Sequence, residues 1–145
     1  PTTGLDPQVR HLIWEKLRHL KEDGITILLT THYMEEAFQI CDTILIMDKG
    51  KNIMEGAPQS LLDTHIERYA LEIMKRGAVS TLDSGLNTAV ARKDDSHDLP
   101  VFYSNDFDAL KRLADRLESG EYYLRQSNLE DLFLKATGRK LNEQQ

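Results

Sequence analysis

Two polar residues, His32 and Asp6, stand where side chains of α/β proteins commonly do chemistry. His32 follows an apolar, β-branched run over residues 25–29, which is typical of a strand covered on both faces. Open α/β sheets bind ligands just beyond the carboxyl ends of their strands, and His32 stands at such a position. Asp6 precedes Pro7, and this pair indicates a helix start, because the carboxylate can accept hydrogen bonds from the N–H groups of the first turn.

A helix is expected over residues 7–21, because apolar side chains recur there at helical spacing and Gly24 can end it. The apolar stripe consists of Val9, Leu12, Ile13, Leu17 and Leu20. Trp14 lies at the edge of this stripe, where packing is a more natural role than ligand binding. Basic side chains largely outside the stripe are expected to form a solvated face rather than an anion site, and they are Arg10, His11, Lys16, Arg18 and Lys21.

The residues after His32 predict a second helix and a hairpin. The helix is expected over residues 34–40, with Glu35 and Glu36 in its first turn, where acidic side chains interact favourably with the helix dipole. A strand pair with a turn at Lys49-Gly50 and another short helix should follow. Their expected ranges are 43–48, 51–55 and 59–64.

In order and spacing, these residues resemble the second half of an ABC-transporter ATPase domain. The D-loop of that family is similar to Thr3-Gly4-Leu5-Asp6. Its switch-histidine loop is similar to Thr31-His32 followed by Tyr33-Met34-Glu35-Glu36-Ala37. A later family stretch is matched by Asp48, Gly50, Gly56 and Pro58. The resemblance implies an α/β fold, namely the C-terminal part of a P-loop ABC ATPase domain.

The resemblance also implies a role for each matched residue. His32 would contact the γ-phosphate of ATP during hydrolysis, and an imidazole at a strand end can donate to phosphate oxygens. Thr3, Gly4, Leu5 and Asp6 would touch the nucleotide site of the opposite subunit, with Gly4 allowing close backbone approach. Two simpler interpretations stay open. His32 could merely cap the following helix, and Asp6 could be a helix cap alone or serve both roles.

Several family motifs have no counterpart in the chain: the Walker A phosphate loop, the glutamine loop, the Leu-Ser-Gly-Gly-Gln signature and the acidic Walker B strand. In family members these motifs precede the D-loop. The chain is therefore expected to be a C-terminal fragment of a parent ATPase that uses ATP and Mg²⁺. By itself the fragment is expected to bind no cofactor and to be inactive.

The remaining residues predict a second unit of α+β type. Its strands are expected over residues 68–74, 87–92, 101–103 and 122–126, its first two helices over 78–83 and 106–118, and a polar turn over 93–98. Gly120 should end the second of these helices. The last helix would begin at a capping box, Ser127-Asn128-Leu129-Glu130, and end at Gly138. This order of elements suggests a small ferredoxin-like domain.

The second unit resembles the accessory domain that follows the ATPase in one bacterial subfamily. That subfamily includes exporters of nodulation lipooligosaccharides and of anthracycline-type drugs, and residues 129–139 carry the most specific part of the resemblance. The expected domains are residues 1–66, the C-terminal part of the ABC ATPase domain, and residues 67–138, the accessory domain. Residues 139–145 are expected to be a frayed tail.

Composition narrows the classes of function. A net charge of −6 argues against a nucleic-acid surface, which needs clustered Lys and Arg, and against direct adsorption to anionic lipid. The apolar runs are far too short to span a bilayer. Cys41 is the only cysteine, so an internal disulfide is impossible, a reducing cytoplasm is favoured and a packing role is expected.

No metal site is expected from the spacing of possible ligands. Apart from His32, the histidines show no matched spacing to one another or to Cys41, and they are His11, His19, His65 and His97. An acidic group lacks the spacing and the glycine of a calcium loop, so a solvated turn is expected at Asp94, Asp95 and Asp98.

The parent is therefore predicted to be the cytoplasmic ATPase subunit of an ABC exporter. It would pair with a second ATPase subunit and bind membrane-spanning permease subunits, which would hold it at the inner face of the cell membrane. One rival is a regulatory or dimerisation module that binds a small ligand. Another is an ABC ATPase without a membrane partner, acting in translation or DNA repair. The acidic balance, the single module and the exporter-like C-terminal stretch count against the latter.

We expect the isolated chain to self-associate. In the family the strand over residues 25–31 lies beside the Walker B strand, so without that neighbour its backbone groups and an apolar face would be left open. Light scattering at micromolar concentration should detect oligomers formed by edge pairing or by exchange of the first helix and strand, while residues 68–138 stay folded. A clean monomer of 16.6 kDa with its first helix packed in place would contradict this expectation.

Overall fold

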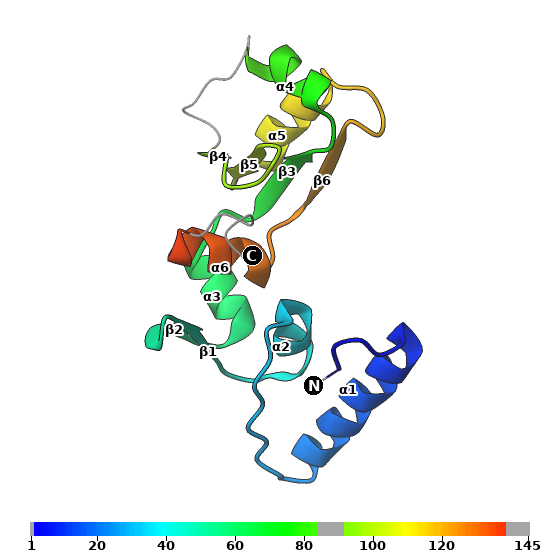
Figure 1. Cartoon of the computed structure of the whole chain (residues 1–145), viewed down its shortest axis with the longest axis vertical. Coiled ribbons are helices and arrows are strands. Elements are labelled where there is room, and N and C mark those ends of the chain that lie inside the picture. Colours follow the sequence, from blue (N-terminus) through cyan, green and yellow to red (C-terminus); the bar gives the residue numbers. More distant parts are fainter. Residues whose placement is uncertain (1, 84–91, 139–145) are drawn as a thin grey trace. The chain divides into compact units, whose positions relative to one another are not determined.

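A computed structural model describes residues 2–83 and 92–138 of the chain. The chain divides into two compact units, Pro1–Leu61 and Leu62–Gln145, whose elements are labelled in Figure 1. The domain boundary expected between residues 66 and 67 stays a prediction. Within the two described stretches, no helix is both long and apolar enough to cross a membrane.

The first unit begins with two helices that lie where the sequence predicts them. Helix α1 spans Pro7–Glu22 and α2 spans Met34–Ile40. Asp6 caps α1, since its Oδ1 accepts a hydrogen bond of 2.8 Å from the Gln8 N–H. Beyond α1, Gly24 has a φ of 85°, a left-handed conformation that glycine adopts without strain.

The face of α1 that packs on α2 differs from the predicted apolar stripe. Trp14 is 3% exposed, whereas Val9 and Leu12 of the stripe are 43% and 65% exposed. Arg10 and Lys21 lie on the same helical face as Trp14, so their assignment to a solvated face is wrong. Helical spacing identifies an apolar stripe on α1, but it does not identify the element that packs against the helix. The sequence could therefore not show which face of α1 meets α2.

Lys21 fastens the end of α1 to the end of α2. Its Nζ donates to the Ile40 carbonyl at 2.6 Å and forms a 2.7 Å ion pair with the Asp42 carboxylate. A cation at the last carbonyls of a helix is favourable, because the helix dipole places partial negative charge there. The two helices are thereby held together at their distal ends.

The strand predicted over residues 25–29 is not formed. These residues are neither helical nor paired as a strand, and the Leu28 side chain is 96% exposed. A strand exists through hydrogen bonds to a neighbour, and the described residues place no strand beside this segment. The apolar, β-branched pattern therefore predicts that this segment favours an extended conformation. It does not show whether a neighbouring strand is present to pair with it.

The hairpin of the first unit is confirmed. Strand β1 (Ile44–Asp48) pairs antiparallel with β2 (Lys51–Gly56). Lys49 and Gly50 have φ values of 48° and 75°, as the two central residues of a tight hairpin turn require. Helix α3 follows over Pro58–His65.

The second unit contains a four-stranded antiparallel sheet in the order β4-β5-β3-β6. The strands are β3 (Tyr69–Ile73), β4 (Arg92–Asp94), β5 (Val101–Ser104) and β6 (Tyr122–Gln126). The helices are α4 (Arg76–Asp83), α5 (Phe107–Ala114) and α6 (Leu129–Thr137). The predicted α+β class is confirmed for this unit. Except for Arg92, the strand predicted over residues 87–92 lies outside the described residues, as does the tail over 139–145.

The two faces of this sheet have different chemistry. Side chains alternate along each strand, so Leu71 and Phe102 lie on one face, in a core completed by Leu82 of α4 and Leu110 of α5. The opposite face carries polar side chains, and part of it is covered by α6. This second face is described with the candidate site.

Two local boundaries in the second unit differ from the sequence predictions. Helix α5 ends at Ala114 rather than near Gly120, because the next turns tighten to hydrogen bonds between Arg116 N and Leu113 O and between Leu117 N and Ala114 O. The polar turn predicted from residue 93 begins later, since Arg92–Asp94 pairs with β5 as β4.

The capping box of α6 is present but shifted by one residue. Asn128, not Ser127, is the N-cap, and its side chain accepts from the Asp131 N–H while the Asp131 carboxylate accepts from the Asn128 N–H. Ser127 continues the pairing of β6, because its N–H donates to the Arg68 carbonyl. Gly138 ends α6 with a φ of 64°, as predicted.

The register of this capping box can be tested with two neighbouring alanine variants. Asn128→Ala should lower the free energy of unfolding by about 1 kcal/mol, because an orphan N–H of the first turn loses its acceptor. Ser127→Ala is the matched control and should change little, since the buried Ser127 Oγ has no hydrogen-bond partner among the described residues. Urea titrations followed by circular dichroism measure both. A larger loss for Ser127→Ala would restore the register predicted from the sequence.

Candidate functional site

The carboxylate of Glu36 is the polar centre of the first unit. Its side chain is fully buried, with 0% exposure. Its Oε1 accepts hydrogen bonds from the Thr2 hydroxyl at 2.6 Å, the Thr2 N–H at 3.1 Å and the Trp14 indole N–H at 3.4 Å. Glu36 lies in α2, Trp14 in α1 and Thr2 in the loop that leads into α1. One carboxylate therefore joins three segments of the chain.

These contacts keep Glu36 ionised. Burial alone would raise the pKa of a carboxyl group, but the hydrogen bonds from Thr2, Thr31, the amino terminus of the chain and Trp14 favour the charged form more strongly. The pKa of Glu36 is lowered from its ordinary value of 4.5 to about 2. The carboxylate is consequently a permanent acceptor at neutral pH.

The predicted D-loop residues form a tight turn beside this cluster. The Leu5 N–H donates to the Thr2 carbonyl at 3.2 Å, and Gly4 has a φ of 81° at the third position of the turn. That position of a turn favours glycine when φ is positive. Thr3, Gly4, Leu5 and Asp6 are all exposed. The turn is thus held at Thr2 and presents the next residues to the outside.

His32 is also exposed and lies between two anchored residues. The Tyr33 N–H donates to the Thr31 hydroxyl at 3.0 Å, and the Tyr33 hydroxyl accepts from Arg10 of α1 at 2.8 Å. The Arg10 guanidinium also lies 4.7 Å from the centre of the Tyr33 ring, a cation–π contact. These contacts fix the loop on both sides of His32 and leave its imidazole accessible.

The capping interpretation of His32 gains no support from this geometry. The N-cap of α2 is Tyr33, and its side chain makes no capping hydrogen bond. His32 stands one residue before that position. Its exposure at the tip of an anchored loop suits a residue that meets a ligand or a partner.

The structure brings the two predicted motifs onto one support, which the sequence did not reveal. The turn at Thr3–Asp6 and the loop at His32 are both tied to the α1–α2 pair through Glu36, Tyr33 and Arg10. Glu36 was expected only to favour the helix dipole. The only feature of the sequence that pointed to this role is the position of Glu36, an acidic residue one helical turn beyond His32. The burial of Glu36 depends on α1 and Thr2, which local spacing does not reveal.

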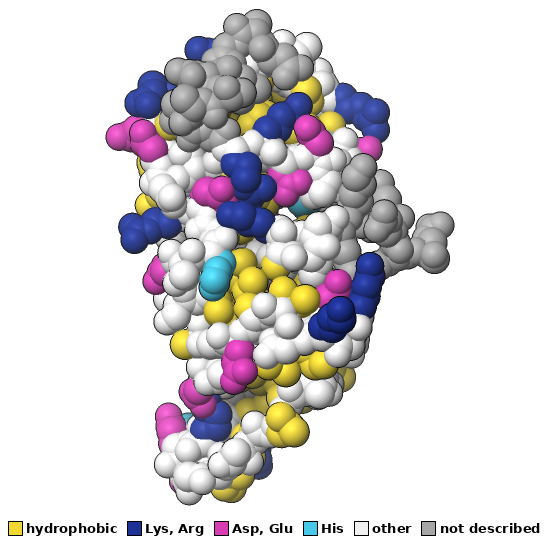
Figure 2. Space-filling model, turned by 90° about the vertical axis from the view of Figure 1, so that its left-hand side faces the viewer, with side chains coloured by type: hydrophobic (Ala, Val, Ile, Leu, Met, Phe, Trp, Pro, Cys, Tyr) yellow, Lys and Arg dark blue, Asp and Glu magenta, His cyan; other side chains and the backbone are white. Residues whose placement is uncertain are grey.

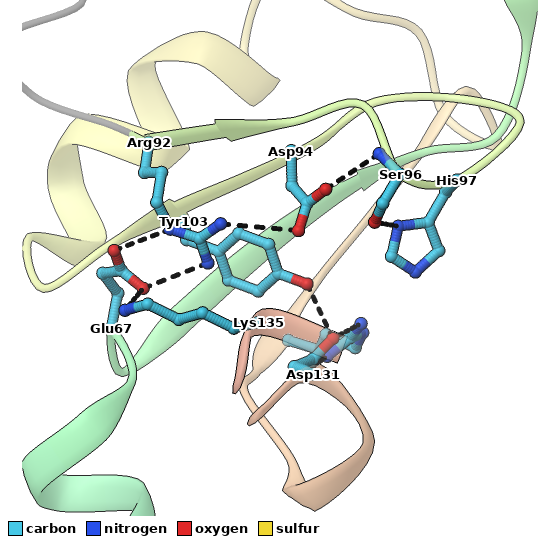
Figure 3. Close-up of polar contacts among 9 residues, drawn as sticks. Glu67, Arg92, Asp94, Ser96, His97, Tyr103, Asp131 and Lys135 are labelled. Atoms are coloured by element: carbon cyan, nitrogen blue, oxygen red, sulfur yellow. Dashed lines mark hydrogen bonds and ion pairs between the residues drawn. The ribbon is translucent and has the colours of Figure 1, made fainter. Parts of the chain in front are cut away.

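A second polar cluster lies on the face of the sheet that α6 covers, and Figure 3 shows it. Asp131 of α6 is 4% exposed. Its carboxylate accepts two hydrogen bonds from Arg125, at 2.6 and 2.9 Å, and one of 2.7 Å from the Tyr103 hydroxyl. Burial and the neighbouring Asp131 charge raise the pKa of the Tyr103 hydroxyl far above its ordinary value. The hydrogen bond to Asp131 likewise raises the pKa of Arg125. These groups bond α6 to β5 and β6.

Arg92 extends this cluster along the sheet. Its guanidinium lies 4.4 Å from the centre of the Tyr103 ring and forms ion pairs with Glu67 at 2.9 Å and Asp94 at 3.4 Å. Lys135 of α6 also pairs with Glu67, at 3.2 Å. Burial tends to raise the pKa values of Glu67 and Asp94. Hydrogen bonds donated by Arg92 to Glu67 and by Ser96 to Asp94 outweigh this effect, so both pKa values are lowered. Positive and negative groups in this cluster pair with one another, so their charges are compensated within the domain.

On the face drawn in Figure 2, Lys and Arg side chains lie among Asp and Glu side chains rather than in a separate basic area. Within residues 2–83 and 92–138, no group of three or more His, Cys, Asp and Glu side chains could hold a metal ion. The thiol of Cys41 is half-buried, and this burial raises its pKa, as expected for an unreactive packing residue.

Comparison with known proteins agrees with the class predicted from the sequence. Residues 79–138 match the family model described as nodulation factor export protein NodI, C-terminal domain. Together with the relatives below, this match confirms the resemblance to the ATP-binding subunits of ABC exporters.

The relatives share a name and match almost the entire chain. The chain is 44% identical to the Nod factor export ATP-binding protein I of Mesorhizobium japonicum and 40% identical to that of Burkholderia lata. Each match extends over 143 residues, which is 99% of the chain. It is also 44% identical over 144 residues to the protein of that name from Sinorhizobium fredii, again 99% of the chain. The matches cover 42%, 47% and 41% of these relatives, so the chain spans less than half of their length.

The buried Glu36 carboxylate predicts a specific dependence of stability on pH. Because its folded pKa is about 2, below the ordinary 4.5, it stabilises the fold above pH 4.5 and loses this effect as the pH falls towards 2. Glu36→Gln should lower the free energy of unfolding by about 2 kcal/mol at pH 7, and the difference from wild type should shrink towards zero near pH 2. Urea titrations followed by Trp14 fluorescence across this pH range measure it. A difference independent of pH would contradict the prediction.

Proposed function

We propose that the chain is the C-terminal part of the ATP-hydrolysing subunit of an ABC exporter. The observation that carries this proposal is the common support of two exposed loops, the turn at Thr3–Asp6 and the loop at His32, on one buried carboxylate. Both loops match motifs of that family. The printed names of the relatives, which refer to export, favour an exporter over an ATPase without a membrane partner.

In this proposal the described residues perform two tasks. The exposed imidazole of His32 donates a hydrogen bond to the γ-phosphate, where negative charge is redistributed during hydrolysis. Thr3, Gly4, Leu5 and Asp6 contact the nucleotide site of a second ATPase subunit. The backbone conformation of Gly4 and the Asp6 cap set the shape of the turn that makes this contact.

The described residues fit ATP and Mg²⁺ only in part. His32 is accessible to a phosphate, but no cluster of possible metal ligands is present in the two described stretches. Because the Walker A, signature and Walker B motifs have no counterpart in the sequence, this proposal assigns the phosphate loop, the Mg²⁺ ligands and the catalytic carboxylate to other residues of the whole protein. The chain by itself is inactive and takes neither ATP nor Mg²⁺.

The second unit acts as the ferredoxin-like accessory domain of this subunit. Its β-α-β-β-α-β order and the position of β5 between β3 and β4 support that assignment. The whole protein works in the cytoplasm, at the inner face of the cell membrane, where it binds permease subunits. ATP-driven closure of two ATPase subunits moves that permease between its inward- and outward-open states.

The proposed role of His32 is tested in the whole protein. His32→Ala should lower ATP turnover by about 100-fold or more, the scale for losing one preorganised donor to developing charge, while ATP affinity changes little. A steady-state ATPase assay and calorimetric titration with ATP measure the two quantities. The 145-residue chain serves as the control and should show no micromolar ATP binding. Near-normal turnover of the variant, or stoichiometric ATP binding by the chain alone, would contradict the proposal.

A further inference from the structure

We infer that Glu36 is a positioning residue that sets the turn at Thr3–Asp6 relative to His32. The inference rests on the proposed function, because it concerns how these two loops are held for ATP hydrolysis. Glu36 is buried and does not reach the surface where the loops are exposed. It therefore acts through Thr2 and α2, not by touching a substrate.

Thr2 is the residue through which Glu36 holds the turn. Thr2 is 0% exposed and immediately precedes the exposed turn. Its hydroxyl and its N–H both donate to the same oxygen of Glu36, so its side chain and its backbone are fixed together. The Thr2 carbonyl accepts the hydrogen bond that closes the turn at Leu5. The starting point and the closure of the turn thus both depend on Thr2.

Glu36 is also linked to His32, through the start of α2. Glu36 lies in the first turn of α2, one helical turn after His32, and α2 begins directly after the His32 loop. A shift of this helix start would therefore carry the Glu36 carboxylate, and with it the anchor of Thr2, in the same direction. Trp14 adds a third point of attachment, because its indole N–H donates to the same oxygen from the middle of α1. The loop, α1 and α2 therefore keep one geometry.

A charged acceptor suits this arrangement better than a neutral one. Hydrogen bonds to a carboxylate are shorter and stronger than those to a neutral oxygen, as the 2.6 Å contact from Thr2 illustrates. Leaving the Thr2 donors unpaired in a buried place would favour a different turn conformation. Because catalytic rate is sensitive to displacements of about 1 Å, a loosened turn should slow turnover without any change at His32 itself.

Substitutions of Thr2 separate positioning from packing. Thr2→Val keeps the shape and the methyl group but removes the hydroxyl donor, whereas Thr2→Ser keeps the hydroxyl and loses the methyl group. In the whole protein, Thr2→Val should lower kcat by about 10-fold or more with little change in KM for ATP, and Thr2→Ser should retain nearly wild-type kcat. A packing role would produce the reverse order.

Glu36 and its neighbour give a matched pair. Glu36→Gln keeps one acceptor oxygen without the charge and should lower kcat in the same direction as Thr2→Val. Glu35→Gln is the control, since Glu35 is exposed and bonds Gln39 on the surface of α2. Trp14, the only tryptophan of the 145-residue chain, gives a readout independent of ATP. Its emission should change in Glu36→Gln and stay unchanged in Glu35→Gln.

The outcomes distinguish this inference from the proposed function. A wild-type whole protein without ATPase activity would overturn the proposed function and this inference with it. An active wild type whose kcat survives Thr2→Val and Glu36→Gln, or falls more in Thr2→Ser than in Thr2→Val, would overturn the inference alone. An unchanged Trp14 emission in Glu36→Gln would do the same. Loss of kcat in Thr2→Val and Glu36→Gln, with Thr2→Ser and Glu35→Gln active, would support it.

Discussion

A carboxylate removed from water must be surrounded by hydrogen-bond donors, and this constraint organises both units of the chain. Glu36 meets it in the first unit through Thr2 and Trp14. Asp131 meets it in the second through Arg125 and Tyr103. In each case the donors come from segments distant in the sequence, so satisfying one buried charge brings those segments together. Removing the donors in either place would leave an uncompensated buried charge, which is strongly destabilising.

The consequences differ between the units. Around Glu36, the tethered segments carry two exposed loops, so the buried charge supports surface residues that match family motifs. Around Asp131, the tethered segments are a helix and two strands, and the surrounding ions are paired with one another. The same chemistry therefore holds two exposed loops in one unit and closes a polar sheet face in the other. This difference places the candidate site in the first unit.

The similarity to export ATP-binding proteins fits this division. The family model that matches residues 79–138 describes a C-terminal domain and lies wholly in the second unit. The two loops, by contrast, lie in the first unit, and their sequences resemble motifs of the general ABC ATPase family. This pattern is consistent with the proposed division of the chain into part of an ATPase domain and an accessory domain. The second unit also has a hydrophobic core of its own, which includes Leu71, Phe102 and Leu110.

The sequence by itself determined the features that depend on near neighbours in the chain. Helices α1, α2 and α6, the Lys49-Gly50 hairpin and the Asp6 cap follow from periodicity, glycine and capping chemistry. Only the tertiary structure decided that Trp14 rather than Leu12 is buried, that Asn128 rather than Ser127 caps α6, and that residues 25–29 pair with no described strand. It also decided that Glu36 is an internal acceptor. Each of these features depends on a segment distant in the sequence that provides a hydrogen-bond donor, a neighbouring strand or an apolar surface. The local spacing of residues does not identify that segment.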